Sequence, residues 1–166
     1  MIRRAIAAVV AMGLPLAMPA AAQGPGGLSL EQVDFSPECE PSAMFEQMLM
    51  VDQGVHVDVA EQLLEERKIT DLVAGDASHV VRFDNALGWH GLRLVELRFE
   101  HGFERGPANY TMVFADSPER VREVWNTRGW NLPPVGEKRV IDDEVIVTAV
   151  GIVADGEFAA VTCFVD

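Results

Sequence analysis

The chain changes from helical to strand-like periodicity after Gly75, and the strand-like part sets the fold class. Only one link between consecutive strand-like segments is long enough for a parallel crossover. The predicted strands are 79–83, 92–101, 108–115, 138–141, 145–153 and 158–165. Because short links join antiparallel neighbours, the sequence predicts an α+β fold with an antiparallel sheet of about five or six strands.

Helices are expected at three places around this sheet. Two precede it: residues 42–50 carry apolar side chains at helical spacing, and a capping box at Asp58 begins a second helical region that ends at Gly75. The third, 118–128, separates two groups of three strands and follows the capping residue Ser117. We therefore expect two N-terminal helices and one intervening helix to pack on the sheet.

The beginning of the chain has the organisation of an export signal. Arg3 and Arg4 precede an uncharged apolar stretch, and small residues lead to a cleavage position before Gln23. A retained membrane anchor is the alternative, because the uncharged stretch 5–22 approaches the length that spans a bilayer. The predicted organisation is a signal peptide over 1–22, an extended or flexible segment over 23–40 and a single α+β domain over 41–166, with a periplasmic or secreted location.

The charge of the chain limits its partners. The net charge is −13, and removal of a leader with two arginines and no acidic residue makes it −15. Such a charge repels nucleic acid phosphates and anionic membrane surfaces, so we expect neither partner once the leader is cleaved. It favours a protein or peptide with a basic surface, although acidic residues that serve only solubility are the simpler alternative.

Two cysteines, Cys39 and Cys163, lie near opposite ends of the mature chain. In an oxidising compartment their pairing as a disulfide is expected. Two buried free thiols are the alternative. There is no C-x-x-C pair, which a redox enzyme would favour.

Aromatic residues in short glycine- or proline-containing segments are candidates for partner binding. Trp89 stands in the segment GWHG, and Trp130 and Asn131 precede Pro133-Pro134. Aromatic side chains on rigid loops often anchor protein interfaces. Packing of both tryptophans in the core is the alternative.

Possible metal ligands are densest at the ends of the strand predicted over 92–101. They are His90, His101, Glu100 and Glu104. Imidazole and carboxylate groups suit a divalent ion, but no H-x-x-x-H or H-E-x-x-H unit is present, and a surface strand end with a turn explains the group more simply. The acids 142–144 are expected to form a solvated turn.

The sequence contains no motif that identifies a reaction or a cofactor. A G-x-S-x-G nucleophile elbow is absent, and the only glycine cluster follows the leader instead of a strand. The first hypothesis is therefore an exported, non-enzymatic binding or protein-interaction domain. The alternatives are an acidic inhibitor or immunity-type protein that covers a basic active site, and a metal-dependent enzyme that uses His90, His101 and nearby carboxylates.

Overall fold

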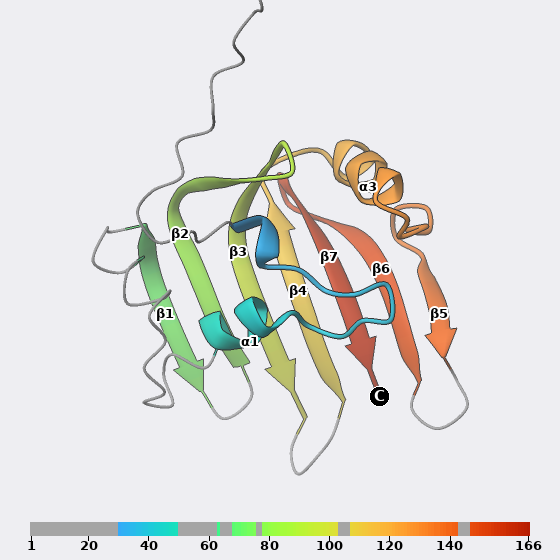
Figure 1. Cartoon of the computed structure of the whole chain (residues 1–166), viewed down its shortest axis with the longest axis horizontal. Helices are drawn as coiled ribbons and strands as arrows, with labels where there is room; N and C mark the ends of the chain where they lie inside the picture. Colours follow the sequence, from blue (N-terminus) through green and yellow to red (C-terminus); the bar gives the residue numbers. More distant parts are fainter. Residues whose placement is uncertain (1–29, 50–62, 64–67, 76–77, 103–106, 143–146) are drawn as a thin grey trace, which may run out of the picture.

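The computed structural model describes residues 30–49, 63, 68–75, 78–102, 107–142 and 147–166. Across these residues, seven strands form one antiparallel sheet in the order β1-β2-β3-β4-β7-β6-β5 (Figure 1). The strands are β1 (Ile69–Gly75), β2 (Ser78–Trp89), β3 (Leu92–His101), β4 (Ala108–Phe114), β5 (Lys138–Asp142), β6 (Thr148–Asp155) and β7 (Phe158–Val165). The α+β class and the antiparallel sheet are confirmed, but the sheet has more strands than the five or six predicted.

The path of the chain through the sheet follows from the lengths of its links. Strands β1 to β4 are consecutive antiparallel neighbours, and β5 to β7 form a second meander whose last strand pairs with β4. The link between the two meanders contains α3 (Pro118–Thr127). Its N-cap is the predicted one, because the hydroxyl of Ser117 accepts a hydrogen bond from the backbone N–H of Arg120 at 3.3 Å.

Two predictions at the start of the sheet are wrong. Residues 69–75, assigned to a helical region, form the edge strand β1, and β2 runs beyond its predicted end at Phe83 to Trp89. A register shift between Arg82 and Leu87 accommodates the polar residues Asp84 and Asn85 within β2. The helix predicted from Asp58 lies outside the described residues apart from Leu63.

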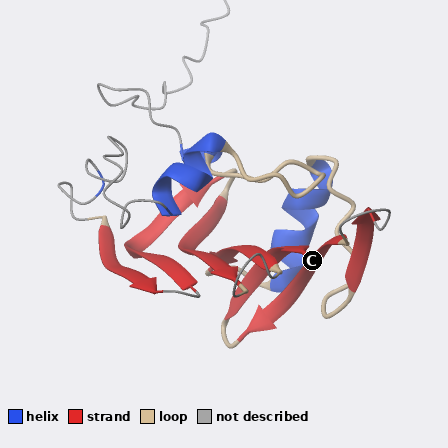
Figure 2. Cartoon of the chain, turned by 90° about the horizontal axis from the view of Figure 1, so that it is seen from below, coloured by secondary structure: helices blue, strands red, loops and turns tan. Residues whose placement is uncertain are grey.

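One face of the sheet carries the hydrophobic core. The short helices η1 (Leu30–Gln32) and α1 (Ala43–Leu49) lie on the same side of the sheet as α3 (Figure 2). Helix α1 contacts β2 and β3, whereas α3 contacts β6 and β7. Two aromatic pairs join these layers: Trp89 on β2 stacks on Trp125 of α3 at 5.0 Å between ring centroids, and Phe45 of α1 lies 6.0 Å from Tyr110 on β4.

The other face of the sheet is not covered by any described helix or loop. Its β1–β4 half is polar, and ion pairs link Asp71, Arg82, Glu96 and Arg98 in turn across β1 to β3. Arg98 then reaches across β4 and β7 to Asp155 on β6, at 2.9 Å. Such alternation between one buried and one solvated face is typical of antiparallel sheets.

The β5–β7 half of this uncovered face is more apolar. Val140, Val153 and Phe158 are 55%, 42% and 41% exposed. Nearby, the ammonium group of Lys138 lies 3.5 Å from the ring centroid of Phe164. This half of the uncovered face therefore exposes apolar side chains to solvent beside one cation.

Candidate functional site

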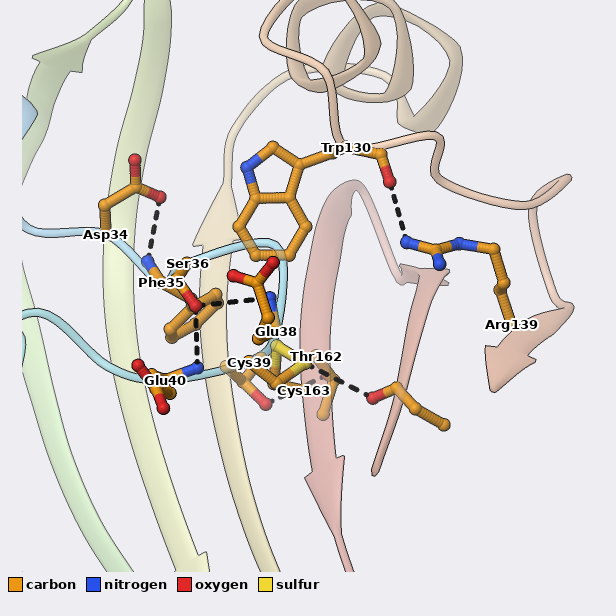
Figure 3. Close-up of a disulfide and its surroundings, with 12 residues drawn as sticks. Asp34, Phe35, Ser36, Glu38, Cys39, Glu40, Trp130, Arg139, Thr162 and Cys163 are labelled. Atoms are coloured by element: carbon orange, nitrogen blue, oxygen red, sulfur yellow. Dashed lines mark hydrogen bonds between the residues drawn. A yellow bond between two sulfur atoms is a disulfide. The ribbon is translucent and has the colours of Figure 1, made fainter. Parts of the chain in front are cut away.

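Residues 34–42 form a looped segment, here called the strap, that crosses the covered face of the sheet. Its two ends are joined by an antiparallel bridge between Phe35 and Pro41, and the backbone N–H of Ser36 donates to the carbonyl of Glu40 at 2.7 Å. The hydroxyl of Ser36 accepts the backbone N–H groups of Glu38 and Glu40 (Figure 3). Backbone groups and the Ser36 hydroxyl therefore hold the turn of the strap, and the carboxylates of Glu38 and Glu40 are not part of these contacts.

A disulfide fixes the tip of the strap to the sheet. Cys39 is bonded to Cys163 on β7 with 5.4 Å between their Cα atoms, and both residues are buried (Figure 3). Cys39 adopts a φ of 67°, which is uncommon outside glycine and asparagine. The predicted disulfide is confirmed, and it holds the strap against β7.

An open groove of about 660 Å³ lies between the strap and one end of the sheet. Ligand sites in proteins commonly have volumes of this order. The strap supplies one wall, and β4, β5, β6 and β7 supply the rest. The lining residues are Glu38, Cys39, Glu40, Pro41, Tyr110, Ile141, Asp142, Thr148 and Val165.

The charge of the groove is uniformly negative. Glu38, Glu40 and Asp142 are all exposed, and none of the nine lining residues is basic. The arginine of β5, Arg139, donates instead to the backbone carbonyl of Trp130 (Figure 3) and to that of Asn131. A cation entering the groove therefore meets carboxylates without a competing positive lining residue.

Tyr110 on β4 contributes an aromatic surface to the groove. Its ring stacks on Phe99 at 5.0 Å and meets the edge of Phe45 at 6.0 Å, so neighbouring rings fix its orientation. Burial raises the pKa of its phenol, and the negative charge of Glu46 on α1 raises that pKa further. The phenol is therefore neutral at neutral pH, and Glu46 is the acidic residue whose charge acts on it.

The three carboxylates do not form a metal centre. The part of the chain that the structure describes contains no group of three or more histidine, cysteine, aspartate or glutamate residues suited to hold a metal ion. In Figure 3 the carboxylates of Glu38 and Glu40 stand apart from each other. A hard cation such as Ca²⁺ needs six to eight oxygen ligands at about 2.3–2.6 Å.

The tryptophans selected from the sequence lie in the core. Trp89 is 0% and Trp130 is 2% exposed, so both indole rings pack in the core, which is the alternative to partner binding given above. The indole N–H of Trp89 donates to the carbonyl of Val33 at 2.8 Å, and Arg128 packs over its ring. Asn131 is exposed with a φ of 50° and lies outside the groove lining.

The candidate metal ligands are not brought together among the described residues. His90 occupies the two-residue turn before β3, and His101 ends that strand, which puts them about 30 Å apart at roughly 3.3 Å per residue. Glu100 and His101 are consecutive in β3 and project to opposite faces. Glu104 lies outside the described residues.

Sequence reasoning missed most of the groove. Tyr110, Ile141, Thr148 and Val165 were assigned only to strands, and Asp142 to a solvated turn. One signal was available, because the predicted disulfide places the acids flanking Cys39 beside the end of the last strand. Those acids, Glu38 and Glu40, form the strap wall.

Comparisons with known proteins give no relative from which a function can be transferred. No family model matches the chain, and neither a curated protein nor a solved structure matches it. Separately, no helix among the described residues is long and apolar enough to cross a membrane.

Proposed function

We propose that this protein is an exported, non-enzymatic binding domain that recognises a basic protein or peptide in the groove beneath the strap. The single observation that carries the proposal is the groove lining, which contains three carboxylates and no basic residue. The overall charge of −13 adds long-range attraction for a basic partner. The leader and the disulfide support a periplasmic or secreted location.

Rigidity of the groove supports binding as its role. The disulfide anchors the strap tip, and the buried ring of Phe35 anchors its base among aromatic side chains. A site that is already ordered loses less conformational entropy when a partner binds. The fixed strap therefore favours affinity without a folding step.

The concave shape of the site also separates this proposal from the inhibitor alternative. An acidic inhibitor of a basic active site presents a projecting acidic surface to its target. Here Glu38, Glu40 and Asp142 border a depression that receives a projecting group. We therefore favour a domain whose groove receives a basic group that projects from its partner.

Binding of a lysine-rich peptide to the mature protein tests the proposal. A glutamate-rich peptide of equal length is the control, and affinity is measured by calorimetry at two salt concentrations. We expect binding of the basic peptide only, weakened by added salt because the exposed charges are screened. The proposal is wrong if neither lysine-rich nor arginine-rich peptides bind, or if their binding is insensitive to salt.

Charge-neutral substitutions locate the binding. The double change Glu38→Gln and Glu40→Gln removes two wall charges and is expected to weaken binding by about tenfold, from roughly 0.7 kcal/mol per exposed charge pair. The double change Glu137→Gln and Glu157→Gln is the matched control, because both residues are exposed and lie outside the groove lining, Glu157 in the turn at the other end of β6 and β7. An equal effect of both changes would assign binding to net charge and contradict the groove.

A further inference from the structure

We infer that the groove takes a single long basic side chain, lysine or arginine, projecting from the partner protein. The inference rests on the proposed function and adds the chemical group that enters the site. Two properties of the groove lead to it: the apolar and aromatic residues of its lining, here called its floor, and the position of its carboxylates on different elements.

The floor of the groove suits an aliphatic stem. Ile141 and Val165 contribute branched side chains, Pro41 contributes a ring, and Tyr110 contributes an aromatic surface. Lysine and arginine bury their methylene groups against apolar surface while their charged ends stay at polar groups. A small inorganic cation gains nothing from this floor.

The carboxylates suit a head group with several N–H donors. Glu38 and Glu40 belong to the strap, whereas Asp142 ends β5, so they approach from different elements. An ammonium group has three donors and a guanidinium has five, which allows contact with separated carboxylates. The absence of a metal-binding cluster in the described part of the chain agrees with this spacing.

The open shape favours a side chain attached to a protein over a free polyamine. Small-molecule sites commonly bury 70–90% of the ligand surface, roughly speaking, and so enclose it. This groove is open to solvent. A partner protein that inserts one side chain covers the rim with its own surface, which a free diamine cannot do.

Two peptides that differ at one position test the inference on the mature protein. Each carries a central residue, lysine in one and norleucine in the other, in an otherwise glycine- and serine-based sequence. Norleucine keeps the aliphatic stem and removes the charge. We expect the lysine peptide, and a matching arginine peptide, to bind at least about tenfold more tightly, as loss of a charge-assisted contact implies.

Tyr110 supplies a readout that general charge attraction does not move. It is the only tyrosine in the chain, so phenolate absorbance reports this residue alone. A cation bound beside the Tyr110 phenol stabilises the phenolate form. The alkaline titration midpoint of Tyr110 should therefore fall when the arginine peptide is added, because arginine keeps its charge at high pH. The acidic residues around the groove are Glu38 and Glu40 of the strap and Asp142 of β5, and Glu46 of α1 also acts on Tyr110.

The outcomes separate the inference from the proposed function. Equal binding of the lysine and norleucine peptides overturns the inference, while salt-dependent binding of a lysine-rich peptide would leave the proposed function intact. An unchanged Tyr110 midpoint at saturating arginine peptide places the cation outside the groove and also overturns it. Failure of every basic peptide to bind contradicts both.

Two ligands that compete with the lysine peptide, spermidine and Ca²⁺, test whether the groove takes another kind of occupant. Tighter binding of spermidine than of the lysine peptide would assign the groove to a free polyamine. Stoichiometric competition by Ca²⁺, beyond the effect of equal ionic strength, would assign it to a metal. Either result overturns the inference.

The variant with Glu38→Gln and Glu40→Gln should bind the lysine peptide more weakly at an unchanged thermal midpoint, since both carboxylates are exposed.

Discussion

Cys39 on the strap and Cys163 on β7 are joined across a sequence separation of 124 residues. The bond connects the N-terminal part of the described chain to a strand inside the sheet, and the groove lies beside it. It therefore both stabilises the fold and holds one wall of the candidate site.

Replacement of both cysteines by alanine should lower the free energy of unfolding by about 2–5 kcal/mol. The reason is that the unfolded chain loses a long closed loop and gains conformational entropy. Denaturant unfolding of the two proteins measures the difference. A change under about 0.5 kcal/mol would show that the disulfide does not constrain the unfolded state to this extent.

Tyr110 should ionise above its ordinary pKa of 10.0, because burial and Glu46 both disfavour phenolate. Since the pKa of Tyr110 is raised in the folded protein, the protonated phenol contributes to the stability of the fold. This contribution is complete below pH 10.0 and is lost as the pH rises through the folded pKa. Ultraviolet titration of the folded and the unfolded protein measures both midpoints. Glu46→Gln should lower the folded midpoint only partly, because burial is the larger cause; an unchanged midpoint would contradict the contribution of Glu46.

Glu96 should be the most sensitive member of the charge chain on the uncovered face. Its buried carboxylate accepts from Arg82 at 2.7 Å and also from Arg98. Glu96→Gln should destabilise the fold by about 1–3 kcal/mol, as expected for loss of charged hydrogen bonds. The exposed pair of Arg120 and Glu123 is the control, and Arg120→Gln should cost less than about 1 kcal/mol. Equal effects of the two changes would contradict this ranking.

Trp89 should contribute to the stability of the fold and should not contact the partner. Trp89→Phe removes the donor to Val33 and leaves a buried carbonyl without it, at a cost of about 1–3 kcal/mol. Thermal unfolding measures this loss. Under conditions where the variant is folded, its affinity for the lysine-rich peptide should be unchanged; a selective loss of affinity would restore Trp89 as a binding residue.

Local sequence patterns predicted β3 and α3, the elements that depend on residues close together in the sequence. The alternation over 92–101 gave β3 with its observed bounds, and the Ser117 cap gave the start of α3. The signals failed where pairing between distant residues decides the structure. Residues 69–75 form a strand because they pair with β2, and β2 continues past polar residues because its far end pairs with β3 and buries Trp89.

The groove could be predicted only in part, for the same physical reason. Its lining comes from the strap and from four strands, which the sheet order brings together. The expected disulfide locates Glu38 and Glu40 near β7, but no local pattern places Tyr110 or Ile141 opposite them. That juxtaposition depends on β7 lying between β4 and β6, a choice that the turn signals leave open.

The central claim is that the groove beneath the strap binds a basic side chain, and chemical-shift mapping by nuclear magnetic resonance tests it most directly. The isotope-labelled mature protein is titrated with the lysine peptide, and the norleucine peptide is the control. We predict shifts concentrated at the strap, Tyr110, Ile141, Thr148 and Val165 with the lysine peptide alone. Shifts spread over the uncovered face, or equal shifts with both peptides, would contradict the claim.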